Sequence, residues 1–253
     1  MRTVVFLLPV YNEAAGLDAL LERIRATAEQ ESWACKVVAV NDGSSDDSNA
    51  ILIRWQARLP IEIVTHRYNR GLGETLRDGF EWVGDHCAAD DIIVTMDADD
   101  THDPSYVKAM LEKIDAGADV VIASRFEPGA EVRGVPHYRE LFSTGAYMVL
   151  QSALHIPGVR DYACGYRAMR AAIIQTALRR FGGRLIELRE WGFICTAEVL
   201  WKLSRCGARC AEIPFVLRYD LKASPSKMRA LRTIAGYGLL AWKGVGARLT
   251  RPA

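Results

Sequence analysis

Short apolar runs rich in β-branched residues alternate with helical patterns through the first half of the chain. This alternation constrains the fold more than any other feature of the sequence. Each run has the length of a buried strand, and the segments between the runs carry apolar residues at helical spacing. Alternation of this kind predicts an α/β fold, with a mostly parallel sheet covered by helices on both faces. The predicted strands cover residues 3–10, 37–40, 61–65, 91–95 and 119–123.

Polar residues follow four of these strands at the point where each strand ends. They are residues 11–13 after the first strand, Asp42 after the second, Asp97 and Asp99 after the fourth, and Arg125 after the fifth. In open α/β sheets, ligands bind at the carboxyl ends of the strands, so these residues predict a nucleotide crevice. The chain has no P-loop, and no G-x-G-x-x-G follows the first strand, which disfavours kinase-type and dinucleotide-binding proteins.

The acidic stretch after the fourth strand is the strongest local signal for a metal. Asp97 and Asp99 lie two residues apart, and two carboxylates on one side of a loop repel each other unless a cation lies nearby. Oxygen ligands suit Mg²⁺ or Mn²⁺, which take one or two carboxylates together with substrate phosphates. The alternative is an acidic turn that caps a helix starting at Pro104. That alternative explains Asp103 as an N-cap, but it explains neither Asp97 nor Asp99.

The second half of the chain departs from regular alternation. Its apolar patterns predict helices over residues 138–155, 168–181 and 195–206. A late strand over residues 212–217 contains Pro214, which favours a place at the edge of the sheet.

Composition predicts one main domain for the 253 residues, and half of them are apolar. Six scattered cysteines without a C-x-x-C pair favour free thiols over zinc ligands. The apolar run over residues 4–10 contains Pro9 and fits a first strand better than a signal peptide. No apolar segment is long enough to span a bilayer.

The C-terminal part of the chain differs in charge from the rest. Residues 218–253 carry eight Lys or Arg against one acid, which gives +7 there and leaves −6 for residues 1–217. We therefore divide the chain into a catalytic domain over 1–217 and a basic loop with an amphipathic helix over 218–253. Such a helix can lie in the interface of an anionic membrane, or it can pack on the domain with its basic side in water. Its apolar stripe comprises Met228, Leu231, Ala235, Gly238, Trp242, Val245 and Leu249.

Taken together, these motifs resemble the inverting GT-A (Rossmann-like) glycosyltransferases of family 2, most closely the dolichyl- or polyprenyl-phosphate mannosyltransferase type. The resemblance runs from the first strand to about Lys227. It rests on motifs that follow one another in the family's order and spacing, namely Leu8–Glu13, Asn41–Asp46, Asn69–Gly73, Asp97–Asp99, Ala123–Arg125, Asp161 with Gly165–Arg167, Glu212–Pro214, and Arg218 with Ser226–Lys227.

The resemblance implies a nucleotide site and a metal site. The residues that would hold the nucleoside are Pro9, Tyr11, Glu13 and Asp42. Asp97 would lie beside the nucleotide, and Asp99, the second acid of the D-x-D motif, would ligate Mg²⁺ or Mn²⁺ on the diphosphate. Thr101 stands where the polyprenyl-phosphate enzymes usually carry Gln as a further metal ligand, so the implied metal set is Asp99, Asp97 and Thr101.

The resemblance also implies a site for the acceptor. Arg125, Arg139 and Ser143 match positions that receive the acceptor phosphate in the lipid-phosphate enzymes. Arg218 and Lys227 would close over the diphosphate from the late basic loop. Related enzymes also carry a pair of C-terminal transmembrane helices, for which this sequence has no counterpart.

The resemblance implies transfer of a hexose, of mannose or glucose type, from GDP-mannose or a UDP-hexose to a polyprenyl phosphate. The enzyme would be peripheral, at the cytoplasmic face of an anionic membrane, and would bind no nucleic acid. A lipid phosphate is already an anion at neutral pH, so it needs no general base. Arginines and a divalent ion would instead balance the charges of the two phosphates.

Two alternatives remain open at this point. The acceptor could be a hydroxyl of a glycan or small molecule, in which case a base is needed and Asp161 is the candidate. Asp161 could equally be an anchor for its loop, bonded to backbone amides. The chain could also be a non-catalytic scaffold that binds a nucleotide sugar.

Overall fold

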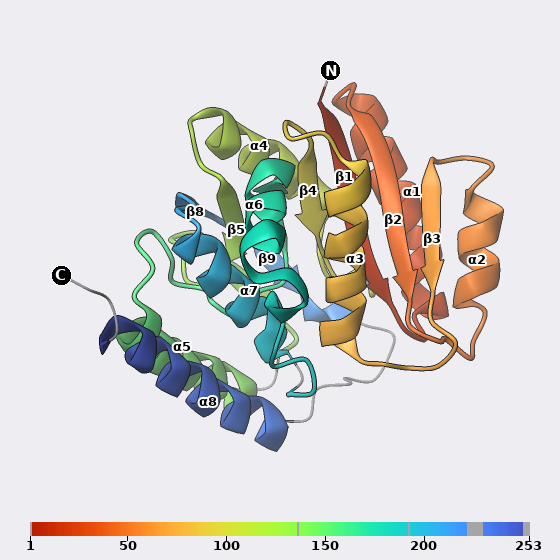
Figure 1. Cartoon of the computed structure of the whole chain (residues 1–253). Coiled ribbons are helices and arrows are strands. Elements are labelled where there is room, and N and C mark those ends of the chain that lie inside the picture. The colour runs from red at the N-terminus through yellow and green to blue at the C-terminus, as the bar shows by residue number, and fades with distance from the viewer. Residues whose placement is uncertain (1, 136, 192, 222–229, 250–253) are drawn as a thin grey trace.

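The computed structural model describes residues 2–135, 137–191, 193–221 and 230–249, with the backbone alone for residues 137–144, 146, 230–232 and 247–249. A seven-stranded sheet forms its centre, in the order β3-β2-β1-β4-β7-β5-β8 (Figure 1). Neighbouring strands are parallel except around β7, which is antiparallel to both β4 and β5. The strands are β1 (Thr3–Val10), β2 (Ala34–Asn41), β3 (Ile61–Thr65), β4 (Ile92–Thr95), β5 (Val120–Ser124), β7 (Arg167–Arg170) and β8 (Cys210–Pro214).

Helices cover both faces of this sheet, as the alternation of the sequence predicts. One face carries α1 (Ala14–Gln30), α2 (Ser48–Trp55) and α4 (Val107–Asp115), and the other carries α3 (Leu72–His86), α6 (Ala171–Phe181) and α7 (Ile194–Arg205) (Figure 1). An ion pair between Lys108 and Glu31, at 3.0 Å, joins α4 to α1.

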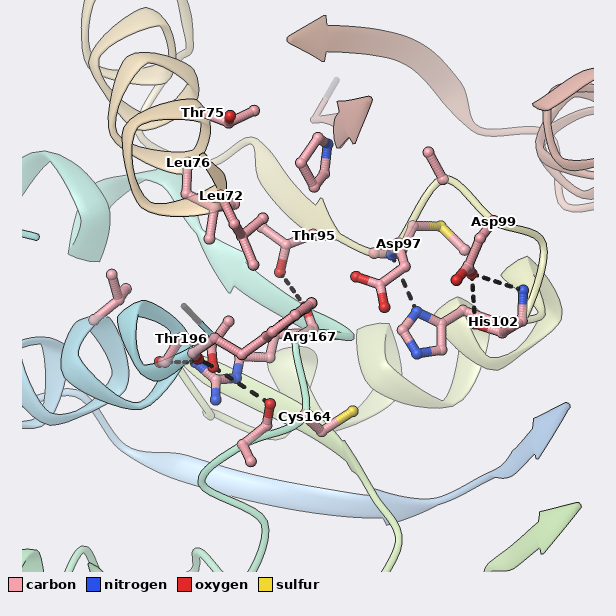
Figure 2. A pocket seen from close by; sticks show the side chains of 18 of the residues that line it. Leu72, Thr75, Leu76, Thr95, Asp97, Asp99, His102, Cys164, Arg167 and Thr196 are labelled. Atoms are coloured by element: carbon pink, nitrogen blue, oxygen red, sulfur yellow. Dashed lines mark hydrogen bonds between the residues drawn. The ribbon is translucent and has the colours of Figure 1, made fainter. Parts of the chain in front are cut away.

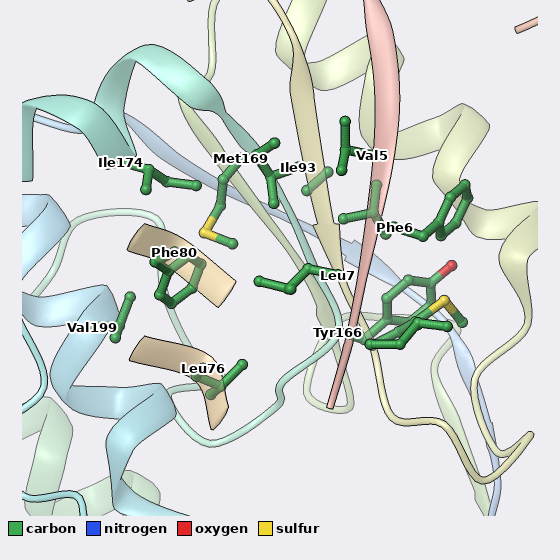
Figure 3. Packing of buried hydrophobic residues seen from close by; sticks show 14 of the residues in the cluster. Val5, Phe6, Leu7, Leu76, Phe80, Ile93, Tyr166, Met169, Ile174 and Val199 are labelled. Carbon is green, nitrogen blue, oxygen red and sulfur yellow. The ribbon is translucent and has the colours of Figure 1, made fainter. Parts of the chain in front are cut away.

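The core lies between the sheet and these helices, and β1 contributes to both of its layers. Successive side chains of a strand point to opposite faces, so Leu7 and Phe6 separate. Figure 3 shows Leu7 on the side of Phe80 and Leu76 of α3, and Phe6 on the side of Tyr166. The helix α3 lies close to β1 at Gly79, where an added Cβ would lie 2.5 Å from Leu7 Cδ1.

The structure corrects two predictions for the second half of the chain. Residues 168–170 are not helical. They belong to β7, which is inserted between β4 and β5, and the helix begins only at Ala171. The late strand predicted over 212–217 is divided at Phe215 into β8 and β9 (Val216–Arg218), and β9 pairs with β6 (Glu131–Arg133) in a separate two-stranded sheet. The predicted edge position is confirmed, because β8 is the last strand of the main sheet.

Two helices extend beyond the sheet and lie side by side, α5 (His137–Leu154) and α8 (Ala230–Leu249) (Figure 1). They approach closely at Gly244, where an added Cβ would lie 2.5 Å from Leu154 Cδ2. Among the described residues, no helix is both long enough and apolar enough to cross a membrane. The division of the chain at residue 217 stays a prediction.

Candidate functional site

The carboxyl ends of β1, β2, β4 and β5 open onto one cavity of about 1120 Å³. Strand register explains why. Val10 pairs with Asn41, and Leu7 pairs with Thr95, so the residues that follow these strands emerge at the same edge of the sheet. Residues that lie far apart in the sequence therefore share one cavity. The predicted site residues that line it are Pro9, Tyr11, Glu13, Asp42, Asp97, Asp99, Thr101 and Arg125.

The acidic loop after β4 is held by its own side chains and by His102. Asp99 Oδ1 accepts hydrogen bonds from the Thr101 hydroxyl at 2.6 Å and from the Thr101 N–H at 3.2 Å. The Asp97 N–H donates to His102 Nδ1 at 3.1 Å, and the His102 ring stacks on Tyr166 with 5.0 Å between centroids. Figure 2 shows the Asp97 carboxylate on the cavity side of this loop.

The chemistry of this loop fits a divalent ion that is shared with a substrate. Within the described part of the chain, no three His, Cys, Asp or Glu side chains are grouped to hold a metal by themselves. Asp97 and Asp99 instead offer two carboxylates beside a large cavity, which suits Mg²⁺ or Mn²⁺ completed by phosphate oxygens. The Thr101 hydroxyl donates a hydrogen bond to Asp99, so Thr101 supports this carboxylate directly.

Asp103 has the separate role that the capping alternative assigns to it. It is the N-cap of the turn that begins at Pro104, and its side chain accepts a hydrogen bond from the Ser105 N–H at 2.9 Å. Capping therefore accounts for Asp103 and leaves Asp97 and Asp99 to be explained by the cavity.

Asp42 lies at the end of β2 and holds the glycine-containing loop that leads into α3. Asp42 is 3% exposed, and its carboxylate accepts hydrogen bonds from the backbone N–H groups of Arg70 and Gly71, each at 2.8 Å. Gly71 has φ of 88°, a left-handed conformation that favours glycine. The Asp42 carboxylate thus shapes one wall of the cavity.

Arg125 and Asp161 form an ion pair at the end of β5, in which the Asp161 side chain is fully buried and the Arg125 side chain is 21% exposed. The guanidinium donates from Nε to Asp161 Oδ2 and from Nη2 to Oδ1, both at 2.7 Å. The same carboxylate also accepts N–H bonds from the backbone of Arg125, Ala163 and Cys164. Burial alone would raise the pKa of Asp161, but the Arg125 charge and these hydrogen bonds hold it below its ordinary value.

The remaining predicted residues are placed differently. The Arg218 guanidinium pairs with Asp220 at 2.9 Å rather than lining the cavity, although its backbone N–H donates to the Thr101 carbonyl at 3.2 Å. Arg139 and Ser143 lie in the part of α5 for which the structure describes the backbone alone, and Lys227 lies outside the described residues altogether. The roles of all these residues stay predictions.

Several residues that line the cavity carried no usable signal in the sequence. Arg189 and Glu190 come from an irregular segment that no pattern places beside α3, and Tyr237 comes from α8. Arg189 donates to Glu74 at 2.7 Å. Its backbone passes so close to α3 that a Cβ on Gly73 would lie 2.5 Å from Arg189 Cα. Gly73, the second glycine of the N-R-G-L-G motif, is thus a sequence feature that marks this close contact.

Comparison with known proteins identifies the family. A model described as "Glycosyl transferase family 2" matches residues 5–178, more than half of the chain. An undecaprenyl-phosphate mannosyltransferase of Micrococcus luteus is 30% identical over 97% of this chain and 98% of its own length. A polyprenol monophosphomannose synthase of Mycolicibacterium smegmatis is 29% identical over 99% and 89%. A dolichol-phosphate mannosyltransferase of Pyrococcus furiosus is 29% identical over 98% of this chain, which spans just under two thirds (66%) of that protein.

Solved structures agree on the fold. Glucosyl-3-phosphoglycerate synthase from Mycobacterium tuberculosis, solved with Mn²⁺, UDP and phosphoglyceric acid, superposes with a TM-score of 0.63 at 18% identity, covering 100% of this chain and 80% of that one. This similarity confirms the predicted GT-A architecture. The chain belongs to glycosyl transferase family 2, and it is a glycosyltransferase.

Proposed function

We propose that this glycosyltransferase moves a hexose from a nucleotide sugar to a polyprenyl phosphate, with a divalent metal at Asp97 and Asp99. The observation that carries the proposal is that one cavity joins this acidic loop to Arg125, whose guanidinium is held in place by Asp161. The names of three relatives, each a mannosyl transferase or synthase of a polyprenyl-type phosphate, support the acceptor class and make mannose the first sugar to test.

The state of Asp161 favours a phosphate acceptor over a hydroxyl acceptor that would use this residue as base. Asp161 is 0% exposed, each of its oxygens accepts N–H bonds, and its pKa lies below the ordinary range. A carboxylate in this state takes up a proton poorly. A lipid phosphate needs no such base, because it is an anion at neutral pH. We therefore propose that Asp161 orients the Arg125 guanidinium.

The proposed reaction is a single displacement. A phosphate oxygen of the acceptor bonds to the anomeric carbon as the bond from that carbon to the nucleoside diphosphate breaks, and the electron pair leaves on the diphosphate. A bound Mg²⁺ or Mn²⁺ would neutralise the charge on that leaving group. Arg125 would bind the incoming phosphate, and the walls formed by the Asp42 and Asp97 loops would orient the donor.

A transfer assay tests this function. Radiolabelled GDP-mannose, UDP-glucose and UDP-N-acetylglucosamine would each be incubated with polyprenyl phosphate and Mn²⁺, and label in the organic phase would be counted. We expect label from one donor to enter the lipid phase, to be lost with EDTA, and to return when Mn²⁺ is restored in excess. Donor hydrolysis without lipid product would contradict the lipid acceptor, and no donor turnover would favour the non-catalytic alternative.

We also propose that α5 and α8 hold the enzyme on an anionic membrane as a peripheral protein, at the cytoplasmic face. The helix α8 packs on the domain through Gly236 and Leu240, while Trp242 and Val245 on its outer side are 73% and 45% exposed. On α5, Met148 is 58% exposed. Part of the apolar stripe predicted from the sequence thus faces outward, where it could enter a bilayer interface. The net charge of +7 over residues 218–253 would favour an anionic membrane.

Vesicle flotation tests this surface. The double variant Trp242→Ser with Val245→Ser should bind phosphatidylcholine–phosphatidylglycerol vesicles about tenfold more weakly, because it removes the apolar side chains that would be buried. Ile53→Ser on α2 is a matched control, since Ile53 is 55% exposed at the other end of the molecule (Figure 1). Equal flotation of the double variant and the wild type would exclude this surface as the docking site.

A further inference from the structure

His66 lies directly after β3, and both of its ring nitrogens face carboxylates. Nδ1 lies 2.6 Å from Asp42 Oδ1, and Nε2 lies 2.9 Å from Asp78 Oδ2 on α3. The residue is only 6% exposed, and its backbone N–H donates to the Asn41 carbonyl at 2.8 Å. The ring is therefore fixed between the end of β2 and the middle of α3.

Both neighbours of the ring are carboxylates, and this sets which hydrogen bonds the ring can make. An ionised carboxylate only accepts hydrogen bonds, so a ring between two carboxylates must donate from both nitrogens, as the imidazolium does. Asp42 acts as an acceptor on both of its oxygens, because Oδ1 also accepts the Arg70 N–H and Oδ2 accepts the Gly71 N–H.

The second carboxylate is ionised. Burial would raise the pKa of Asp78, but hydrogen bonds and ion pairs from Arg77 and Arg70 hold it below its ordinary value. Glu74, the remaining charged group of this cluster, pairs with Arg70, Arg77 and Arg189. Each ring nitrogen of His66 thus faces a carboxylate oxygen that can accept a hydrogen bond from it.

This ring acts on the cavity through Asp42. The carboxylate that His66 holds is the one that binds the Arg70 and Gly71 N–H groups, and Asp42, Arg70 and Gly71 all line the cavity. Arg70 also donates from its side chain to Asp78 at 2.7 Å. His66 therefore contacts the Asp42 carboxylate, which in turn binds the loop at Arg70 and Gly71.

We infer that His66, as an imidazolium, is a positioning residue that sets the Asp42 wall of the cavity for a nucleoside diphosphate. The inference rests on the proposed function, since it takes this wall as the nucleotide side of the cavity. His66 does not line the cavity and would act only through Asp42.

Two substitutions separate the two contacts of the ring. The amide nitrogen of His66→Asn replaces Nδ1 and can keep the bond to Asp42, whereas that of His66→Gln replaces Nε2 and can keep only the bond to Asp78. Binding of GDP and UDP with Mg²⁺ would be measured by calorimetry, and unfolding temperatures would be measured in parallel. We expect a Kd about tenfold or more weaker for His66→Gln and a clearly smaller change for His66→Asn, at similar unfolding temperatures. The control is His86→Asn, which changes an exposed histidine at the C-terminal end of α3 and should bind as the wild type does.

Each outcome decides the question. Equal losses in the two His66 variants would reduce the residue to a structural role, and unchanged affinity in both would overturn the inference. If the wild type binds neither GDP nor UDP, the proposed function fails instead. An independent readout is the ¹⁵N spectrum of the His66 ring at neutral pH in the protein without nucleotide. It should show two protonated nitrogens, and one unprotonated nitrogen would overturn the inference without reference to any ligand.

Discussion

Asp99→Asn is expected to lower kcat for sugar transfer by about 10²–10³-fold while leaving the fold intact. The amide oxygen of asparagine can still accept the two hydrogen bonds that Thr101 donates to Asp99 Oδ1, so the loop keeps its shape. What is lost is the negative charge beside the cavity that would bind the divalent ion. The measurement is kcat at saturating donor over a titration of Mn²⁺, with circular dichroism as a check on folding.

The neighbouring Asp100 provides a matched control. Its carboxylate pairs with Arg23 at 2.5 Å and does not line the cavity, and its φ of 64° is a conformation that asparagine tolerates well. Asp100→Asn should therefore keep transfer near the wild-type rate. If Asp99→Asn retained both the rate and the dependence on Mn²⁺, Asp99 would not be the metal ligand.

Asp161→Asn should reduce the free energy of unfolding by about 3–5 kcal/mol, because it leaves the buried end of the Arg125 guanidinium without its counter-charge. Chemical denaturation measures this change. Asp115→Asn is the control: Asp115 pairs with Arg2 at the surface, where its side chain is 54% exposed, and its loss should cost at most about 1 kcal/mol. A loss at Asp161 no larger than this would show that the pair contributes little to stability.

The pH dependence of the free energy of unfolding provides a second test of the Arg125–Asp161 pair. Because the pKa of Asp161 is lower in the folded protein than in the unfolded chain, its contribution is fully present above the unfolded pKa of about 4. The contribution is lost as the pH falls through the lower folded value. Asp161→Asn should therefore weaken the loss of stability in acid, and an unchanged acid limb would contradict the pairing.

The sequence predicted those parts of the fold that depend on local pattern. Each parallel strand ends in polar residues, and parallel strands share an edge, so Asp42, Asp97 and Arg125 could be placed together from the sequence. The segment Arg167–Arg170 could not be read in this way. It is four residues long, buried on both faces of the sheet and followed at once by the apolar positions of α6, so its pattern merges with that of the helix.

Contacts between segments that lie far apart in the chain could not be predicted from the sequence. Both Arg125 and Asp161 were candidates, but their pairing across 36 residues depends on how the loop before β7 folds back onto β5. His66 was not a candidate at all, since its significance comes from two carboxylates on different elements. Only the packed structure brings these three residues to the partners that they contact.

The helix α8 carries side chains both at the outer surface of the molecule and in the wall of the cavity. Tyr237 lines the cavity, and Trp242, five residues further along the same helix, is the most exposed large apolar side chain on this surface. The two residues lie within one and a half turns of a single helix. The membrane contact that we propose at Trp242 and the cavity wall at Tyr237 are therefore built on one element, so a substitution that displaces α8 should affect both.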